Sequence, residues 1–561
     1  MIRPLSFRMM VLVTFIAATA LALPVRAGEY DDASRLSSQL NATPVPDHVT
    51  LTWSDDPYTT MTIAWRTSTD VKQCRFEYNE RGAGRPSVRE AKPEVFRTVD
   101  QDPDPGEMHL YSVKLTDLRS GATYSYRIGN DRKEWTETGS FTTASMETLR
   151  DNRFKFLIFG DSQSGKNDVP DYNDWHKTVQ NAFAANRDAR FFINMGDLVE
   201  VGQSVRHWEN WFRSAKGVID RIPEVPVQGN HETYTAKDKV TVKPVYYLQQ
   251  FRVFTNGPEG LKGQTYSFNY GQVHVVVLDS QGEEESRDAN GKPDPARERQ
   301  FYAVQTAWLR QDLEQNRDAL FTLVFFHKTP YYNKGNRTNV LLKETFCPLF
   351  DQYHVDVVFS GHDHATSRTY PLRNGQFVQS PADGTVYYVT GRSGAKYYGD
   401  LTPKVWDARF YDPQDQPDYQ TVELAGGVLT IKAFRQDGSL LDQYVIDKDH
   451  PENSTSIREP LPSKYRSENP KLILFGNMAL GGRNQAAIVN TKAYADLRAI
   501  ALAADGDYAP EKRALVLPKT AYELTADMLT GDGSKVSIDA LNGMGWFNHY
   551  DPAYNMVFIE K

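Results

Sequence analysis

The sequence contains very little cysteine. Cys74 and Cys347 are the two cysteines among 561 residues, too few for a disulfide framework or for a metal site built from thiolates. They fall in different predicted domains. The sequence leaves open whether they are bonded to each other or are two buried free thiols.

An excess of positive charge is also missing. The chain has 64 Lys and Arg against 72 Asp and Glu, a formal net charge of −8. The basic residues are scattered and form no long block of the kind found in nucleic-acid-binding segments. We therefore expect no nucleic-acid partner.

Long apolar runs are absent after the first few dozen residues. Two arginines, an apolar run at 9–23 and small residues up to Ala27 form the pattern of a signal peptide, residues 1–27. An uncleaved anchor is the alternative, but the run is short for a bilayer span and Pro24 ends it. We expect a secreted or extracytoplasmic protein with no transmembrane segment in the mature chain.

The sequence predicts short strands in the first folded region. Residues 43–145 contain "VTLTW", "MTIAWRT", "CRFEY", "LYSVKL" and "TYSYRI", which are rich in β-branched and aromatic residues and are separated by turn formers such as "SDDP". This pattern predicts an all-β sandwich of roughly a hundred residues. Trp65 and Tyr124 are assigned to its core.

The pattern changes over residues 153–447. Uniformly apolar runs such as "FKFLIFG", "RFFINMG" and "HVVVLDS" alternate with helical stretches such as "WHKTVQNAFAANR" and "QTAWLRQDLEQN". Strands that are apolar on both faces are typical of an α/β domain. In such sheets, functional residues gather at the carboxyl ends of the strands.

The rest of the chain divides into two parts. Residues 448–468 are polar, interrupted by proline and without periodicity, which predicts a linker. Residues 469–561 contain two similar segments, each running from a helix-like stretch through Tyr508 or Tyr550 to a short apolar strand. We expect a small α+β C-terminal domain.

Polar side chains end five of the apolar strands in the α/β region. They are carboxylate, amide and imidazole groups, often beside a glycine that permits a sharp turn: Asp161, Asp197, Asn230, His231, His327, His362 and His364. Salt bridges and helix caps would explain one or two of them but not the set. In "SGHDH", His362 and His364 are two residues apart, so an extended backbone would direct both imidazoles to the same side.

These donor types favour particular metals. Carboxylate, amide oxygen and imidazole without thiolate suit Zn, Mn or Fe. Seven candidate groups are too many for one ion and suit two. Paired metal ions are a common means of hydrolysing phosphate esters, because they clamp the phosphoryl oxygens and generate a hydroxide at moderate pH.

The order of these blocks resembles a known family. Asp161, "GDLVE", "GNHE", "FFH" and "GHDH" are similar to the calcineurin-like metallophosphoesterases, and among them most similar to the purple acid phosphatases. The likeness covers residues 43–446 and includes "LTDLRSGATYSYRIG" and "GTVYYVTGRSGA". It implies a fibronectin-III-like sandwich followed by an α/β metallophosphoesterase sandwich with αββα layers.

The resemblance also implies roles for individual residues. Asp197 would bridge two metal ions, with Fe, Zn and Mn as the candidates. The other ligands would be Asn230, His327 and His362 for one ion, and Asp161 and His364 for the other. His231 would be the acid beside the ligands that protonates the leaving oxygen or steadies the phosphate.

Two positions depart from the family pattern. Purple members carry a ligand tyrosine three residues after the bridging aspartate, where this chain has Glu200, and other members use D-x-H in the first block, where this chain has Gln163. Whether Gln163, Glu200 or water completes the ion on the Asp161 side is left open. We expect no purple colour.

A third departure concerns the substrate. The run "YYNKGNRTN" after His327 lacks the histidines that help plant-type members to bind substrate. Arg337 is left open between binding a phosphate bidentately and being an exposed loop arginine, and Tyr331 and Tyr332 between lining the cleft and packing.

Together these features predict a secreted dinuclear-metal phosphoesterase that hydrolyses phosphomonoesters by attack of a metal-bound hydroxide. A phosphodiesterase or nucleotidase on the same site is one alternative. The other is a cell-surface binding protein with a weakened catalytic domain, motivated by Gln163 and Glu200. Residues 469–561 weakly resemble stalk modules related to the copper amine oxidase N-terminal domain, which suggests contact with a cell wall or surface and implies no copper.

Overall fold

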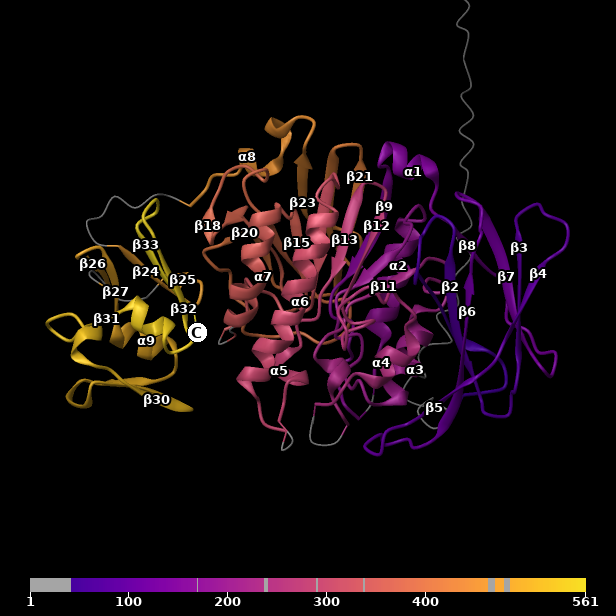
Figure 1. The fold of residues 1–561 in the computed structure, drawn as a ribbon, viewed down its shortest axis with the longest axis horizontal. Helices are drawn as coiled ribbons and strands as arrows, with labels where there is room; N and C mark the ends of the chain where they lie inside the picture. Colours follow the sequence, from indigo (N-terminus) through magenta and orange to yellow (C-terminus); the bar gives the residue numbers. More distant parts are fainter. Residues whose placement is uncertain are drawn as a thin grey trace, which may run out of the picture.

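A computed structural model describes residues 42–168, 170–236, 241–288, 291–335, 337, 339–462, 470–478 and 485–560. The predicted signal peptide, residues 1–27, lies outside the described residues. Figure 1 shows a β-rich N-terminal domain on one side, a layered central domain, and a small C-terminal unit on the far side.

The N-terminal domain is the predicted sandwich. Its two sheets have the strand orders β1-β2-β6-β5 and β4-β3-β7-β8. Trp65 and Tyr124 are buried, as expected, and Trp65 stacks on Tyr111 with ring centroids 5.7 Å apart. The strands are β1 (Asp47–Thr52), β2 (Met61–Thr67), β3 (Cys74–Glu80), β4 (Ser87–Ala91), β5 (Glu94–Arg97), β6 (Glu107–Leu115), β7 (Thr123–Asn130) and β8 (Gly139–Thr142).

The sandwich is joined firmly to the central domain. Arg66 and Glu209, both buried, form an ion pair with 2.8 Å between Nη1 and Oε1. The hydroxyl of Thr52 donates to the Arg252 carbonyl at 2.7 Å. The first two domains therefore share one continuous core.

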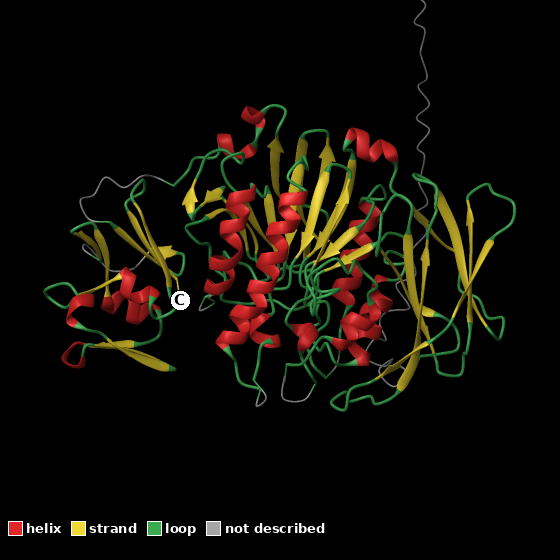
Figure 2. Ribbon diagram, in the orientation of Figure 1, coloured by secondary structure: helices red, strands yellow, loops and turns green. Residues whose placement is uncertain are grey.

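The central domain contains two stacked sheets with helices outside them (Figure 2), the αββα arrangement that was predicted. The sheet orders are β11-β10-β9-β21-β22-β23 and β12-β13-β14-β15-β19-β16-β20. The helices are α1 (Met146–Asp151), α2 (Asn173–Ala185), α3 (Val205–Ala215), α4 (Val245–Gln250), α5 (Gly282–Glu285), α6 (Pro295–Gln315), α7 (Val340–Tyr353) and α8 (Thr455–Arg458). The strands are β9 (Phe154–Phe159), β10 (Phe192–Asn194), β11 (Glu224–Pro226), β12 (Tyr266–Tyr270), β13 (Val273–Val277), β14 (Phe321–Phe325), β15 (Val357–Ser360), β16 (Thr366–Thr369), β17 (Leu372–Arg373), β18 (Gln376–Phe377), β19 (Val386–Thr390), β20 (Asp407–Tyr411), β21 (Asp418–Ala425), β22 (Val428–Arg435) and β23 (Leu440–Asp447).

Burial on both faces explains why the central strands are uniformly apolar. In β14, Leu323 and Phe325 belong to the core between the sheets, whereas Val324 belongs to the core under α6 and α7. Phe325 meets Phe156 of the other sheet with centroids 6.4 Å apart. Each successive side chain thus has an apolar surface to pack against.

Parallel pairing brings the polar strand ends to one edge. β10 is parallel to both β9 and β11, and β14 is parallel to β15. These five strands are the ones that precede the predicted ligand blocks. Their carboxyl ends meet where the two sheets converge.

The C-terminal unit contains the predicted repetition. A strand, a helix and two further strands occur twice, as β27-α9-β28-β29 and β31-α10-β32-β33, with Tyr508 in β28 and Tyr550 in β32. The elements are β24 (Lys471–Leu474), β25 (Asn477–Met478), β26 (Ala486–Val489), β27 (Lys492–Asp496), α9 (Leu497–Ala503), β28 (Asp507–Ala509), β29 (Ala514–Leu517), β30 (Thr520–Glu523), β31 (Lys535–Ser537), α10 (Ile538–Asn542), β32 (Phe547–Asp551) and β33 (Met556–Glu560).

The C-terminal unit packs against the central domain. Lys343 of α7 forms a buried ion pair with Glu560, with Nζ 2.8 Å from Oε2. The rings of Phe377 and Tyr554 meet at 5.2 Å. The predicted linker is also partly attached, because Glu459 forms an ion pair with Arg368 at 2.6 Å; residues 463–469 lie outside the described residues.

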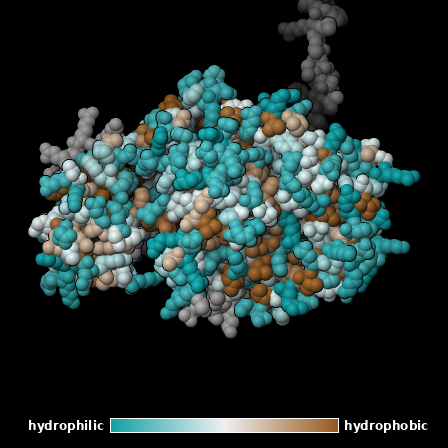
Figure 3. All heavy atoms as spheres, viewed as in Figure 1, coloured by the Kyte–Doolittle hydropathy of each residue, from teal (hydrophilic) through white to brown (hydrophobic). Residues whose placement is uncertain are grey.

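Two further expectations concern the surface and the cysteines. The face drawn in Figure 3 is largely hydrophilic, and among the described residues no helix is both long enough and apolar enough to cross a membrane. Cys74 in β3 and Cys347 in α7 are both buried and free. The structure therefore favours the two-thiol alternative.

The ion pair between the C-terminal unit and the central domain can be tested. Glu560→Ala would leave the buried ammonium of Lys343 without its carboxylate, and we expect this to lower the free energy of unfolding by about 3–5 kcal/mol. Urea unfolding followed by intrinsic fluorescence measures the change. Asp55→Ala is the control: Asp55 pairs with Lys114 at the surface, with side chains 58% and 41% exposed, and should cost less than about 1 kcal/mol. Equal effects of the two variants would contradict the buried pair.

Candidate metal centre

The structure brings all seven predicted strand-end residues to one place. Two ligand groups emerge, one of Asp197, His327 and His362 and one of Asp161, Asp197 and His364, each with donor atoms within 4.8 Å of one another. Asn230 joins the first group, since its Oδ1 lies 3.2 Å from His327 Nε2. Asp197 is common to both groups.

Three of these residues have left-handed backbone, which directs their side chains toward the two groups. Asp197, His362 and His364 have φ values of 49°, 72° and 60°, a conformation that is uncommon for residues other than glycine. The expectation of an extended H-x-H segment is therefore wrong. The two imidazoles converge because each residue turns the chain, after β15 has ended at Ser360.

Hydrogen bonds with Arg337 and Lys334 hold the loop that carries the two histidines. Arg337 donates from Nη1 to the His362 carbonyl and to Asp363 Oδ1, both at 2.7 Å. Asp363 also accepts the backbone N–H of Lys334 at 2.9 Å. These bonds stabilise a backbone conformation that would otherwise be strained.

A buried carboxylate orients the backbone around Asp197, the residue common to both groups. Glu232 accepts the backbone N–H groups of Asp197, Val199 and Gly229 at 2.9, 3.2 and 2.7 Å. Gly229 is required here, because a Cβ on it would lie 2.1 Å from Asp197 N. The sequence contained Glu232 within "GNHE", but nothing in its type distinguished a carboxylate that binds backbone from one that binds solvent.

Two imidazoles are fixed in the form that binds metal. Nδ1 of His327 and Nδ1 of His364 each lie 2.8 Å from a backbone carbonyl, those of Met195 and Lys396. Each Nδ1 must therefore carry the proton, which leaves Nε2 free to act as a ligand. His364 Nε2 then faces Asp161 Oδ1 at 3.2 Å, an arrangement of lone pairs that calls for a cation between them.

The shifts in pKa of these residues also indicate that the site requires positive charge. Burial would lower the pKa of His327, but Asp197 outweighs it and raises the pKa to about 9. Burial would likewise raise the pKa of Asp197, but His327 and His231 hold it below its usual range. Burial, with help from Arg337, lowers the pKa of His362 and keeps it neutral. In the absence of a metal ion, a second proton on the His327 ring, at Nε2, offsets the negative charge of the carboxylates.

Gln163 is better placed than Glu200 to complete the group of Asp161, Asp197 and His364. Gln163 Nε2 lies 3.1 Å from Asp197 Oδ2 and 3.5 Å from His364 Nε2, while its buried Oε1 has no hydrogen-bond partner. Rotating the amide by 180° exchanges the two atoms and directs the oxygen into the second ligand group. The Glu200 carboxylate is already engaged, by Gly165 N at 3.0 Å and Lys396 Nζ at 3.2 Å.

His231 lies beside the ligands, as predicted, with a partner that the sequence did not reveal. Its backbone N–H donates to Asp197 Oδ1 at 2.8 Å and its Nδ1 lies 2.6 Å from the Glu200 carbonyl. Nε2 lies 2.9 Å from Lys396 Nζ. Burial lowers the pKa of His231, Lys396 lowers it further, and Asp197 and Glu200 oppose the shift. A single lysine on a loop gave no signal in the sequence.

The other three candidate residues are structural. Arg337 is committed to the histidine loop and to Tyr398, whose hydroxyl lies 3.2 Å away. Tyr331 and Tyr332 are buried and both pack on the Trp406 ring, at 5.6 and 5.5 Å. For the two tyrosines, packing is the alternative observed, whereas Arg337 is not the exposed loop arginine, because its side chain is 15% exposed and pairs with Asp363.

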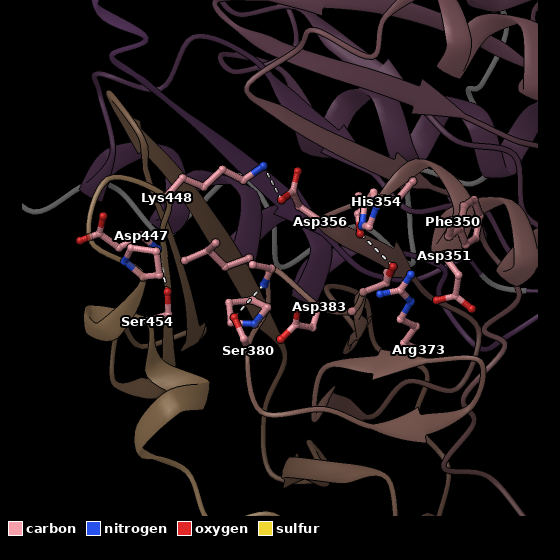
Figure 4. A pocket seen from close by; sticks show the side chains of 17 residues that line it. Phe350, Asp351, His354, Asp356, Arg373, Ser380, Asp383, Asp447, Lys448 and Ser454 are labelled. Carbon is pink, nitrogen blue, oxygen red and sulfur yellow. Dashed lines mark hydrogen bonds and ion pairs between the residues drawn. The ribbon is translucent and has the colours of Figure 1, made fainter.

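A separate cavity lies at the other end of β15 (Figure 4). It has a volume of about 320 Å³, and its lining includes Asp356, Lys448, Arg373 and Asp383. Lys448 Nζ pairs with Asp356 Oδ1 at 2.7 Å. The cavity contains none of the predicted metal ligands.

Comparison with known proteins assigns the domains. Residues 46–143 match the purple acid phosphatase N-terminal domain, and residues 154–366 match the calcineurin-like phosphoesterase family. The chain therefore contains a calcineurin-like phosphoesterase domain, preceded by a purple acid phosphatase N-terminal domain. The second match ends at the histidine loop and contains every predicted ligand.

Several proteins similar to this chain are named purple acid phosphatases. A purple acid phosphatase from Glycine max is 24% identical over 340 residues, covering 59% of this chain and 67% of that protein. A probable inactive purple acid phosphatase 24 from Arabidopsis thaliana is 23% identical over 344 residues, covering 55% and 52%. The structure of purple acid phosphatase PPD1 from yellow lupin has the same fold, with a TM-score of 0.58 at 16% identity over 75% of this chain and 78% of that one.

The hydrogen bonds of Glu232 lead to a prediction about the stability of the chain. Glu232→Ala would leave three buried N–H groups without an acceptor, and we expect it to lower the free energy of unfolding by about 3 kcal/mol or more. Thermal and urea unfolding measure the loss. Glu423→Ala, at an exposed position of β21, is the matched control and should be close to neutral. A Glu232→Ala variant as stable as this control would contradict the role.

Proposed function

We propose that the protein is an exported dinuclear-metal phosphoesterase that hydrolyses phosphomonoesters, acting as an acid phosphatase. The observation that carries the proposal is the pair of ligand groups that share the Asp197 carboxylate. The ions are Fe, Zn or Mn, the metals that suit carboxylate, amide and imidazole donors.

The residues divide between two positions around Asp197. One ion would be held by Asn230, His327 and His362, and the other by Asp161, His364 and the oxygen of Gln163. When bound, the two ions supply Lewis-acid stabilisation of the phosphoryl group and a nucleophile at moderate pH. The chain's own contribution is a set of ligands fixed by backbone turns and by carbonyl acceptors on the far nitrogens of two of its histidines.

His231 supports substrate binding in this proposal. Its Nδ1 donates to the Glu200 carbonyl, and its Nε2 accepts from Lys396. In that form Nε2 carries no proton to give to a leaving oxygen. Of the two roles expected for His231, this form does not supply the acid's proton, and steadying the phosphate would act through the Lys396 ammonium that Nε2 holds.

A second candidate function is a surface-binding protein with a weakened catalytic domain. Gln163 and Glu200 replace two customary ligand residues, and some relatives from Arabidopsis thaliana are named probable inactive. In that case the C-terminal unit would carry the contact with a wall or surface. A phosphodiesterase or nucleotidase would use the same ligands on a different ester.

Metal content distinguishes the first two candidates. We expect the wild-type chain to hold two ions and to hydrolyse 4-nitrophenyl phosphate. Asp197→Ala removes the ligand common to both groups, so both ions and activity should be lost together. Elemental analysis and the hydrolysis assay are done on the same samples. Asp188→Ala, at a surface carboxylate that is 64% exposed, is the control. Less than one ion per chain and no turnover after addition of Zn, Mn or Fe would favour the binding protein.

Gln163 can be tested separately. Gln163→Ala should weaken the second ion by about 10- to 100-fold, because a ligand oxygen is lost. Gln163→His offers a ring nitrogen at the same place and should restore tight binding. Competition with a chelator measures both affinities. An ion bound equally well by wild type and by Gln163→Ala would show that water, and not the amide, completes the site.

A further inference from the structure

A lysine stands at the edge of the metal centre, beside His231. Lys396 lies on the loop that follows β19, and its side chain is 19% exposed. Its Nζ lies 2.9 Å from His231 Nε2 and 3.2 Å from Glu200 Oε1. The ammonium is therefore held within one hydrogen bond of a residue that borders the ligands.

Both ends of Lys396 are fixed to the site. Its backbone carbonyl accepts the Nδ1 proton of the ligand His364 at 2.8 Å. Its side chain is anchored by Glu200, whose other oxygen accepts the N–H of Gly165 at 3.0 Å. Glu200, which stands where purple members place a ligand tyrosine, thus orients a cation instead of a metal.

The neighbouring cations are committed elsewhere. Arg337 pairs with Asp363, Lys328 with Glu284 at 2.8 Å, and Lys334 with Asp400 at 2.7 Å. None of these pairs includes His231. A lysine ammonium has three N–H donors, and Lys396 uses two of them, on His231 and Glu200. One donor remains for a ligand that enters beside His231.

We propose that Lys396 is a substrate-binding residue whose ammonium contacts the non-bridging phosphoryl oxygens and selects dianionic monoesters over monoanionic diesters. The inference rests on the proposed phosphoesterase function. A monoester carries one more negative charge than a diester. A charge-assisted hydrogen bond from a half-buried ammonium therefore stabilises a bound monoester more than a bound diester. Lys396 thereby supplies the phosphate contact that is missing from the segment after His327.

Lys396→Met tests the assignment in the full-length, metal-loaded chain. The substitution removes the ammonium but keeps the backbone carbonyl that orients His364, so the metal content should not change. We expect kcat/KM for 4-nitrophenyl phosphate to fall about 100-fold, and kcat/KM for bis(4-nitrophenyl) phosphate to fall less than about 10-fold. The inhibition constant of inorganic phosphate should rise in parallel with the monoester loss.

Two variants control the interpretation. Lys396→Arg keeps the charge and should recover most of the monoester activity. Lys448→Met removes an ion-paired lysine at the far cavity and should leave both activities and the metal content unchanged. Equal losses on monoester and diester, or unchanged phosphate inhibition in Lys396→Met, would overturn the assignment of Lys396 while the phosphoesterase function stands. A wild-type chain without ions and without turnover would overturn the proposed function, and the assignment with it.

Discussion

The crowding of acceptor atoms around Asp197 is the constraint on which the rest of the centre depends. Two carboxylates, an amide and three imidazoles converge there, and such a set is unstable unless positive charge lies among its members. The local structure keeps the set together despite that repulsion. The left-handed backbone at Asp197, the close approach that Gly229 permits because it has no Cβ, and the acceptor Glu232 all act on the same few atoms.

The two-sheet architecture explains how ligands so far apart in sequence meet. Asp161 and Asp197 come from one sheet, and His327 and His362 from the other. The sheets are locked by the apolar residues between them, such as Phe156 against Phe325. The strands that end at this edge run parallel within each sheet, so their carboxyl ends place the candidate ligands side by side. The loops then turn these side chains toward one another.

Much of this arrangement was predictable, and the exceptions have physical reasons. Strand-end position and residue type identified seven of the residues that meet, because parallel strands share an edge. The backbone at His362 was predicted wrongly, since spacing alone does not distinguish an extended H-x-H from two left-handed turns. Glu232 and Lys396 were not recognised, because a carboxylate that binds backbone and a lysine that binds a histidine look like surface residues in a sequence. The packing of the C-terminal unit on α7 was also not apparent, since it depends on the buried pair of Lys343 and Glu560.

That pair has a consequence for the way the protein is made. Lys343 and Glu560 are 217 positions apart, and ribosomes add about 5–20 residues per second. Glu560 is therefore synthesised roughly 10–40 s after Lys343. During that time the ammonium of Lys343 can rest over the ring of Tyr331, whose centroid is 4.1 Å from Nζ. The ring of Tyr331, four residues after His327, thus packs on a lysine whose carboxylate partner belongs to β33, so the C-terminal unit stabilises the segment next to the candidate metal centre.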